Sequence, residues 1–549
     1  MNMFCYQCQE TARNEGCFKI GVCGKKSDTA DLQDLLIWTA KGVSFWADLA
    51  RKEGINTLKA ADFVINSLFF TITNANFDNA RFAEMVDEGN AIKKDLQANL
   101  EKLGKSFSAL PKAATSQITA KEFLENVDPA VGILAQKNDD IRSLTELLIY
   151  GLKGMAAYAE HAAILGYRSD EVEEFMFRAL ATTLKAEPQQ DEMLNLVVEC
   201  GEKGVAAMAL LNDANTKTYG NPEPTEVNIG VGKNPAILVS GHDLKDFHEL
   251  LEQTKDTGID IYTHGEMLPA HGYPTFKQYP HLVGNYGSAW WKQTDEFEKF
   301  NGPILMTTNC LVPPRDSYKN RVFTTGVVGF EGLTHIPDRV NGKPKDFSAI
   351  IEMAKKSQPP TEIETGSVFT GFGIHTLTQN KDAILDAVSA GLIKRFVVMA
   401  GCDGRFPSRD YYTKVAEKLP ADSIILTAGC AKYRYNKLPL GKIGDFPRVI
   451  DAGQCNDSYS LAVLALTLKD TLKLEDINQL PISFDVAWYE QKAVLVLLAL
   501  LYLGFKNIRL GPTLPAFLSP NIAEFLVKTF DIKPIDTPET DVTAMMAGK

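Results

Sequence analysis

The sequence predicts a multidomain protein of mixed α and α/β class, in which an N-terminal helix-bundle domain is followed by two Rossmann-like α/β domains with mainly parallel sheets. Three observations lead to this prediction. The 549 residues exceed what one hydrophobic core organises. Apolar residues recur with helical spacing from Ser27 to about Tyr219. Beyond that point they form short strand-like runs separated by helical segments.

Two proline-containing segments divide the chain. The sequence NPEP at 221–224 cannot continue a helix, and QPP at 358–360 interrupts the later pattern of strands and helices. We therefore expect three domains: residues 1–224 with a cysteine-rich loop and the helix bundle, residues 225–358 as the first α/β domain, and residues 359–549 as the second.

The first two dozen residues contain four cysteines with the spacing C-x2-C-x8-C-x5-C, namely Cys5, Cys8, Cys17 and Cys23. Four thiolates this close in sequence can surround one centre. Both a [4Fe-4S] cluster and a structural zinc ion use sets of four cysteines, so the spacing alone leaves these two alternatives open.

The helical region begins with an amphipathic segment. Its apolar stripe is predicted to contain Leu32, Leu35, Leu36, Thr39, Val43 and Trp46. Further along, His161 is expected to be a packed histidine rather than a metal ligand, because no cysteine or acid of metal-site type accompanies it. Cys200 lies on an apolar helical stripe and is expected to be a small core residue.

The first α/β domain contains the strand-like runs PAILVSG, GIDIYTH and GPILMTTNC. They are followed closely by His242, Glu266 and Cys310. Because ligands bind at the carboxyl ends of strands in open α/β sheets, these three side chains are candidate ligands. His264 and His271 flank Glu266 in sequence and are candidates for orienting its carboxylate.

In the second α/β domain, three apolar runs each end at a cysteine. FVVMAGC ends at Cys402, SIILTAGC at Cys430 and RVIDAGQC at Cys455. Parallel strands would bring these three thiols to one sheet edge, so they are predicted to converge on a metal cluster. Glu490 and Lys492 interrupt a strongly apolar segment. They mark either the solvated start of a core helix or a buried carboxylate that requires a cation or a metal.

The composition narrows the class of function. The net charge of −12 argues against a nucleic-acid partner, which would require a concentrated basic surface. The N-terminus has no signal-peptide pattern, and the longest apolar stretch, 493–505, is too short to span a bilayer. We therefore expect a cytoplasmic protein without a membrane partner. Nine cysteines in such a chain favour metal binding or redox chemistry over disulfides.

The predicted ligands are of two kinds. Cys310, Cys402, Cys430 and Cys455 are soft sulfur donors, whereas His242, Glu266 and Glu490 are harder donors. Thiolates suit iron–sulfur units, and imidazole or carboxylate suits iron with oxygen or nitrogen ligands. A plain electron-transfer cluster would need only four thiolates. The mixed set therefore predicts a cluster with a sulfur-rich half and a half open to oxygen chemistry.

Several motifs together resemble the hybrid cluster proteins, also called prismane proteins. They are FCYQCQETARNEGC, GVCGK, SGHDL, THGEMLPAH, TTNCLVPP, MAGCDGR, LTAGCAKYRYNK, DAGQCNDSYS and AWYEQKAV. The resemblance covers essentially the whole chain. The short spacing of the N-terminal cysteines resembles the subgroup with a [4Fe-4S] cluster that is found mainly in anaerobes.

The resemblance implies the following site assignments. Cys5, Cys8, Cys17 and Cys23 hold a [4Fe-4S] cluster. A hybrid [4Fe-2O-2S] cluster is held by His242, Glu266, Cys310, Cys402, Cys430, Cys455 and Glu490, with a persulfide expected at Cys402. Glu266, Glu490, Lys492 and His242 are the expected catalytic residues, because proton donors or positioning groups are needed beside the cluster.

The family resemblance also implies an activity, the reduction of hydroxylamine to ammonia and water. It implies an electron-donor protein, which the sequence does not identify, and a monomer. Reduction of nitric oxide in nitrosative-stress defence is an alternative, since both substrates are small N–O species. Protein S-nitrosylation or redox sensing is an alternative of another class. Carbon monoxide dehydrogenase chemistry is disfavoured, because it needs nickel and a different ligand set.

Overall fold

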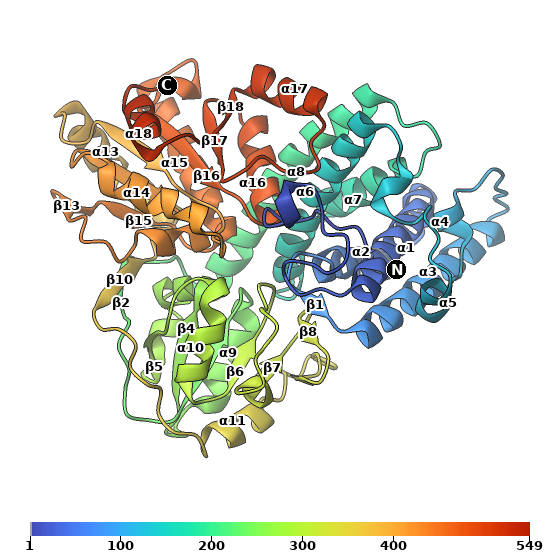
Figure 1. Ribbon diagram of the computed structural model, residues 1–549, viewed down its shortest axis with the longest axis horizontal. Helices are drawn as coiled ribbons and strands as arrows, with labels where there is room; N and C mark the ends of the chain where they lie inside the picture. Colours follow the sequence, from blue (N-terminus) through green and yellow to red (C-terminus); the bar gives the residue numbers. More distant parts are fainter. Residues whose placement is uncertain (1–2) are drawn as a thin grey trace.

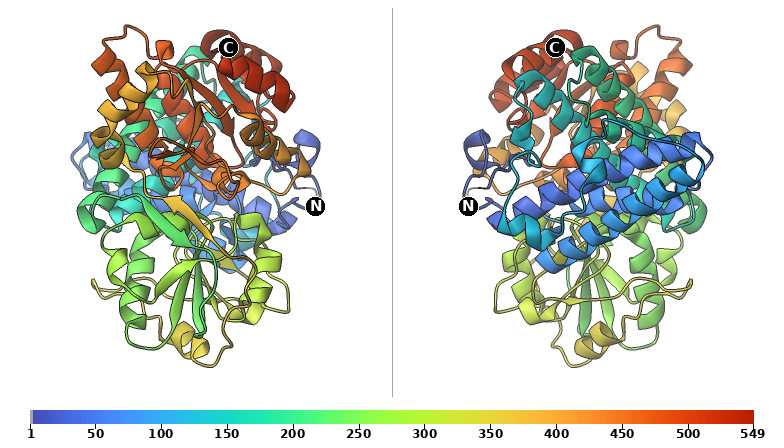
Figure 2. Two further views of the ribbon diagram at one scale, coloured as in Figure 1. Left: turned by 90° about the vertical axis from the view of Figure 1, so that its left-hand side faces the viewer. Right: turned by 90° about the vertical axis from the view of Figure 1, so that its right-hand side faces the viewer.

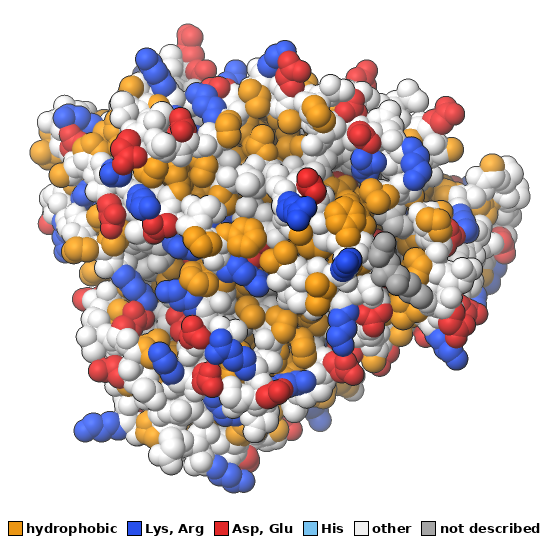
Figure 3. Space-filling model, in the orientation of Figure 1, with side chains coloured by type: hydrophobic (Ala, Val, Ile, Leu, Met, Phe, Trp, Pro, Cys, Tyr) orange, Lys and Arg blue, Asp and Glu red, His pale blue; other side chains and the backbone are white. Residues whose placement is uncertain are grey.

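A computed structural model describes residues 3–549; Met1 and Asn2 of the first predicted domain lie outside this range. The helices of the N-terminal part lie against two regions that are each built on a parallel sheet (Figures 1 and 2). The predicted fold class is confirmed. On the face shown in Figure 3, basic and acidic side chains are interspersed among hydrophobic ones. Among residues 3–549, no helix combines the length and apolarity needed to cross a membrane.

The N-terminal region is helical, as the apolar period predicts. Its main helices are α1 (Ser27–Lys52), α2 (Leu58–Phe70), α3 (Asn79–Lys102), α6 (Asp139–Ala163), α7 (Asp170–Thr182) and α8 (Gln190–Tyr219), with short helices α4 (Lys112–Thr115) and α5 (Ala120–Glu125) between them. The predicted stripe of α1 is buried, and Trp46 at its end is fully enclosed. Cys200 is also fully buried on α8, which confirms its prediction as a core residue. Helix α8 ends at Gly220, whose φ of 87° is left-handed.

The first sheet has six parallel strands in the order β5-β4-β3-β6-β7-β9. Their bounds are β3 (Ala236–Ser240), β4 (Asp260–His264), β5 (Leu282–Asn285), β6 (Ile304–Met306), β7 (Val322–Thr324) and β9 (Thr334–His335). Helices α9 (Leu244–Thr254) and α11 (Ser348–Ala354) cover one face, and α10 (Gln293–Phe300) packs on the other. Because both faces are covered, the central strands β3 and β4 are buried at every position rather than at alternate ones.

The second sheet also has six parallel strands, in the order β15-β12-β11-β16-β17-β18. The strands are β11 (Arg395–Val398), β12 (Ser423–Thr427), β15 (Val449–Asp451), β16 (Ile482–Ala487), β17 (Ile508–Gly511) and β18 (Ile532–Pro534). One face packs against α13 (Lys381–Ser389), α15 (Ser458–Leu472) and α16 (Gln491–Tyr502). The other packs against α14 (Asp410–Lys418) and α18 (Pro538–Met546). Helix α17 (Pro520–Phe530) precedes β18.

Helix α16 joins the second sheet to the helical region, because it packs on both α6 and α8. The close approach depends on glycines. A Cβ atom at Gly201 of α8 would lie 2.3 Å from the carbonyl oxygen of Leu498, and one at Gly154 of α6 would lie 2.9 Å from that of Gln491. This docking fixes where the start of α16, with Glu490 and Lys492, lies in the molecule.

Two short ladders link segments on either side of the predicted domain boundaries. Strand β2 (Thr225–Asn228) pairs antiparallel with β10 (Ser367–Thr370), and β1 (Asn76–Phe77) pairs parallel with β8 (Gly329–Phe330). Each six-stranded sheet lies within one predicted α/β domain. The exact division of the chain at 224 and 358 stays a prediction, because these ladders tie the three parts together.

Candidate metal centre

Three candidate ligands follow the adjacent strands β4, β3 and β6 of the first sheet. His242 follows β3 after Gly241, where a Cβ atom would lie 2.3 Å from Thr307 Oγ1, so this turn accommodates only glycine. Glu266 follows β4. Cys310 lies in the loop after β6 and has a left-handed φ of 76°, a conformation that is costly for a residue with a side chain and is held by the surrounding loop.

The three cysteines of the second sheet follow β11, β12 and β15, which are neighbours in the sheet. The Cys402 N–H donates a hydrogen bond to the Ala487 carbonyl over 2.8 Å. Gly401 and Gly429 both have left-handed φ angles, and a Cβ atom at either would lie within 2.4 Å of a backbone oxygen. Close packing of these turns brings Cys402, Cys430 and Cys455 to one edge, as the sequence predicts.

The two sheet edges face each other. The ligand atoms of His242, Glu266 and Cys455 all lie within 4.8 Å of one another, and all three residues are buried. His242 Nε2 is 3.8 Å from Glu266 Oε2, which accepts a hydrogen bond from the Cys455 N–H over 3.0 Å. Gln454 Nε2 donates to the carbonyls of both His242 and Glu266, over 3.1 and 2.9 Å. The first and second sheets thus share one site.

Glu490 and Lys492 reach the same site from the start of α16. They are only 3% and 2% exposed, so they do not form the solvated start of a helix. Glu490 caps α16 by accepting from the Lys492 N–H over 3.0 Å. Lys492 Nζ lies 3.0 Å from His242 Nε2 and 3.5 Å from Glu490 Oε1, and it donates to Asn309 Oδ1 over 2.9 Å. The buried ammonium therefore binds residues from both sheet regions.

Burial and the neighbouring acidic groups oppose ionisation of the thiols at this site. Burial raises the pKa of Cys310, and the nearby Glu490, Cys402 and Glu266 raise it further, whereas Lys492 lowers it. Burial likewise raises the pKa of Cys455, to about 12. One oxygen of Glu266, Oε1, is buried without a hydrogen-bond partner among residues 3–549.

These features fit a metal centre. An acceptor that is buried and unpartnered is costly unless it binds a cation. Metal coordination also favours the thiolate form that burial otherwise opposes. Burial, together with Lys492, lowers the pKa of His242, which favours the neutral imidazole that metals bind.

Sequence reasoning missed several residues that support the site. Thr308 Oγ1 lies 2.7 Å from His242 Nδ1, and Asn309 Nδ2 donates to Cys310 Sγ over 3.1 Å. Lys432, fully buried, forms an ion pair of 2.6 Å with Asp451 behind Cys430. Their positions in the sequence could have identified them, because each of these residues lies in the same loop as a candidate ligand or ends the strand before one.

The flanking histidines do not orient Glu266, so that prediction was wrong. His264 contacts Ser240 Oγ and Glu296 Oε2, at 2.9 and 3.0 Å, because it ends β4 and points away from the loop of Glu266. His271 contacts Thr263 Oγ1 at 3.0 Å. His161 is 9% exposed, lies 3.0 Å from Glu160, and lines a small cavity together with His242.

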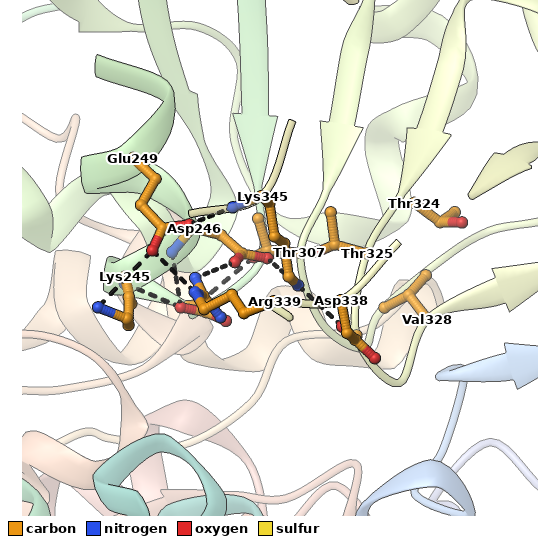
Figure 4. A network of polar contacts seen from close by, with 12 residues as sticks. Lys245, Asp246, Glu249, Thr307, Thr324, Thr325, Val328, Asp338, Arg339 and Lys345 are labelled. Atoms are coloured by element: carbon orange, nitrogen blue, oxygen red, sulfur yellow. Dashed lines mark hydrogen bonds and ion pairs between the residues drawn. The ribbon is translucent and has the colours of Figure 1, made fainter. Parts of the chain in front are cut away.

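A polar network holds the helix that follows His242 (Figure 4). Asp246 of α9 is fully buried and forms ion pairs with Arg339 and Lys345, at 2.5 and 3.0 Å. Glu249, one turn later, also binds Arg339, at 2.8 Å. The network ties the segment 338–345 to α9 and thereby fixes the start of this helix next to His242.

The four N-terminal cysteines form a second group. Cys5 and Cys17 exchange two backbone hydrogen bonds, of 3.1 and 2.8 Å. Burial raises the pKa of Cys8, and the neighbouring thiols of Cys23, Cys5 and Cys17 raise it further. Four thiols in one loop are a donor set that fits either a [4Fe-4S] cluster or a zinc ion.

A short connection links the two cysteine groups. The N–H of Gln9, next to Cys8, donates to the carbonyl of Tyr489, next to Glu490, over 3.0 Å. Gln491 Nε2 donates to the carbonyl of Gln7 over 3.1 Å. The Tyr489 ring stacks on Trp290 with 4.6 Å between ring centroids. The N-terminal loop is therefore bonded directly to the segment that contains Glu490.

Comparisons with known proteins agree with this geometry. The chain is 61% identical to a protein named hydroxylamine reductase from Nitratidesulfovibrio vulgaris strain Hildenborough, and 60% identical to one of the same name from Desulfitobacterium hafniense; each alignment covers 100% of both chains. Among solved structures, carbon monoxide dehydrogenase IV from Carboxydothermus hydrogenoformans has the same fold, with a TM-score of 0.57, 16% identity, and coverage of 99% of this chain and 92% of that chain.

The family model described as Prismane/CO dehydrogenase matches residues 3–543, which include every candidate ligand described above. We conclude that this chain belongs to the Prismane/CO dehydrogenase family.

Proposed function

We propose that this protein is an iron–sulfur oxidoreductase that reduces hydroxylamine to ammonia and water. The observation that carries the proposal is the shared site of soft and hard donors beside the buried Lys492 ammonium, in a chain whose relatives at about 60% identity are named hydroxylamine reductase. The reaction consumes two electrons and two protons per hydroxylamine; the N–O bond breaks, and each fragment leaves fully protonated.

Two cofactors are proposed. Cys5, Cys8, Cys17 and Cys23 would hold a [4Fe-4S] cluster. His242, Glu266, Cys310, Cys402, Cys430, Cys455 and Glu490 would hold a hybrid [4Fe-2O-2S] cluster, with a persulfide at Cys402. When bound, these centres supply electrons and an open coordination position. Membership in the family, together with the orphaned Glu266 oxygen, supports this assignment.

The side chains around the site are suited to hold a proton donor. Burial alone would lower the pKa of Lys492, but the neighbouring Cys455 and Glu490 raise it above its ordinary value. The residue therefore stays an ammonium at neutral pH and is the proposed donor of a hydrogen bond or a proton to the substrate. Asn309 and Glu490 position Nζ, and Thr308 orients the His242 imidazole.

Electrons are proposed to enter at the N-terminal cysteine set. Cys5 and Cys23 are partly exposed there, whereas at the sheet-edge site Cys310 is partly exposed and Cys402, Cys430 and Cys455 are buried. The hydrogen bond from Gln9 to Tyr489 and the adjacent Glu490 give a short bonded route between the two groups. An external electron-donor protein is required, because the residues described here include no source of two electrons per turnover.

The test is anaerobic hydroxylamine-dependent oxidation of a reduced dye, run on protein whose iron and acid-labile sulfide have been counted. About eight irons per chain are expected, as two four-iron clusters require, with one ammonia formed for every two dye electrons. Protein with both centres present that forms no ammonia would reject the proposal. Turnover of nitric oxide by the same preparation would then favour the alternative activity.

A further inference from the structure

A second cavity lies in the helical region, apart from the shared site of the two sheets. Its volume is about 440 Å³, and its walls are mainly α1 and α6. Lining residues on each helix recur at intervals of three and four, so that one complete helical face borders the space. The lining also includes the exposed residues Lys112, Ala130, Ala135 and Ala186, which place a mouth at the surface.

Four of the charged side chains that line the cavity form no ion pair within residues 3–549. Glu146 is only 6% exposed, yet it forms no hydrogen bond or ion pair within residues 3–549. Asp34 and Lys41 on the opposite helix are partly exposed, and they also form no hydrogen bond or ion pair within residues 3–549. Lys153, 1% exposed, donates only to the neutral oxygens of Gln7 and Thr71, each at 3.0 Å. Two acidic side chains and two lysines thus border one space that opens at the surface.

The charged groups at the mouth are already paired, in contrast to those inside. Arg142 binds Asp139 at 2.7 Å, and Lys112 binds Asp128. A ligand would therefore contact the inner charges rather than the rim. The wall between these charges is apolar and includes Ile37, Trp38 and Ile149.

Buried charges without partners oppose their own ionisation. Burial, reinforced by Glu146, raises the pKa of Asp34 to about 8. Burial also lowers the pKa of Lys153, to about 7. A ligand with a single charge would stabilise either the acidic side chains or the lysines and would leave the other pair without a partner. A ligand with both signs would stabilise all four groups, and a volume of a few hundred Å³ is typical of small-molecule sites.

We infer that this cavity binds a small zwitterion of the α-amino acid class with an apolar side chain. Its ammonium group contacts Glu146 and Asp34, its carboxylate is held by Lys41 or Lys153, and its side chain packs on the wall of Ile37, Trp38 and Ile149. Because Cys5 also lines the cavity, the bound molecule lies beside the N-terminal cysteine set. The inference does not depend on the proposed reductase activity.

Isothermal titration calorimetry of the protein with its clusters tests the inference, with L-leucine as the probe. The matched probes are 4-methylpentanoate, which lacks the ammonium group, and 3-methylbutylamine, which lacks the carboxylate. Each is expected to bind about tenfold or more weakly than L-leucine, as the loss of a charged hydrogen bond predicts. Equal binding of either analogue would overturn the inference.

Variants locate the site. Glu146→Gln and Asp34→Asn keep the side-chain shape, and each is expected to weaken L-leucine binding about tenfold. Asp31→Asn is the control, because Asp31 lies one turn before Asp34 on α1 and does not line the cavity. Absence of any heat with millimolar L-leucine on the unaltered protein would show a water-filled space and refute the inference. Binding that persists in both Glu146→Gln and Asp34→Asn would refute it as well.

Discussion

Replacing Lys492 with methionine removes an ammonium group that contacts both His242 and Glu490. Methionine preserves most of the side-chain volume and length, so the change is mainly one of charge. The residue is 2% exposed, and water cannot replace the ammonium without repacking the start of α16. Glu490 would then lose its cationic partner inside a buried site.

The magnitude follows from the contacts. At 3.5 Å and an effective dielectric constant of about 20, the attraction between Lys492 and Glu490 is about 5 kcal/mol, before the cost of desolvation is subtracted. Removing one member of a buried pair typically costs about 3–5 kcal/mol of stability. Loss of a positioned proton donor lowers turnover by a factor of roughly 10² to 10⁴.

The matched control is Lys345→Met. Lys345 is 3% exposed and pairs with the fully buried Asp246 at 3.0 Å, in the network of Figure 4. Both variants should lose similar stability in denaturant. Only Lys492→Met should lose hydroxylamine-dependent dye oxidation, when the rate is expressed per intact centre from iron and sulfide counts. Lys345→Met should stay within about twofold of the parent rate per intact centre, because Lys345 pairs with Asp246 and Asp338 and contacts no candidate ligand.

The reasoning would be wrong if Lys492→Met kept a full set of irons and turned over hydroxylamine within about threefold of the parent rate, since a positioned acid contributes far more than that. Equal loss of rate in both variants would instead show that buried lysines act only through stability.

Three further predictions concern other parts of the structure. Gly401→Ala would place a Cβ atom 2.0 Å from the Ala487 carbonyl oxygen, at a residue whose φ is 108°. The purified variant should therefore contain fewer irons at the sheet-edge centre. An unchanged iron count would contradict the packing described. Cys17→Ser should remove the iron of the N-terminal centre, whereas Cys200→Ser should leave the iron count intact and cost only stability; matched iron loss in both variants would contradict the separate roles. Burial, with Asp541, raises the pKa of Asp485 from 3.8 to about 7, so the folded state favours the neutral acid, and the free energy of unfolding should fall as pH rises from about 4 to 7 and then level off. Asp485→Asn should abolish this fall and raise the free energy of unfolding above pH 7 by at most roughly 4 kcal/mol. Denaturant titrations that show the same pH profile for both proteins would refute this prediction.

Local sequence patterns predicted the secondary structure and much of the site. Apolar spacing fixed the buried stripe of α1, and apolar runs ending in Gly-Cys or Gly-Gln-Cys located three strand ends. Parallel strands that are neighbours in a sheet end at the same edge, so the location of Cys402, Cys430 and Cys455 at one edge follows from the order of their strands. The assignment of these residues as cluster ligands still rests on the family resemblance.

The pairing of His264 with Glu296 could not be predicted from sequence. Its position beside Glu266 in the chain suggested a role at the site, but the residue is the last of β4 and its side chain points to α10. The strand ends at His264, and Gly265, with a left-handed φ of 58°, turns the chain into the 3₁₀ helix Gly265–Gly272 that contains Glu266, so the two side chains do not share the alternation of one strand. The packing of α10 on the first sheet decides that His264 contacts Glu296.

By itself, the sequence determined the fold class, the helical and strand-like regions, and the sheet edges at which the cysteines lie, because these depend on short-range periodicity. Tertiary structure alone decided that Lys492 meets His242, 250 positions away in the chain, and that α1 and α6 enclose unpaired charges. These contacts depend on how closely whole helices approach, as α16 does at Gly154 and Gly201. The distance between two packed helices depends on the packing of many residues at once, and a local sequence pattern does not predict it.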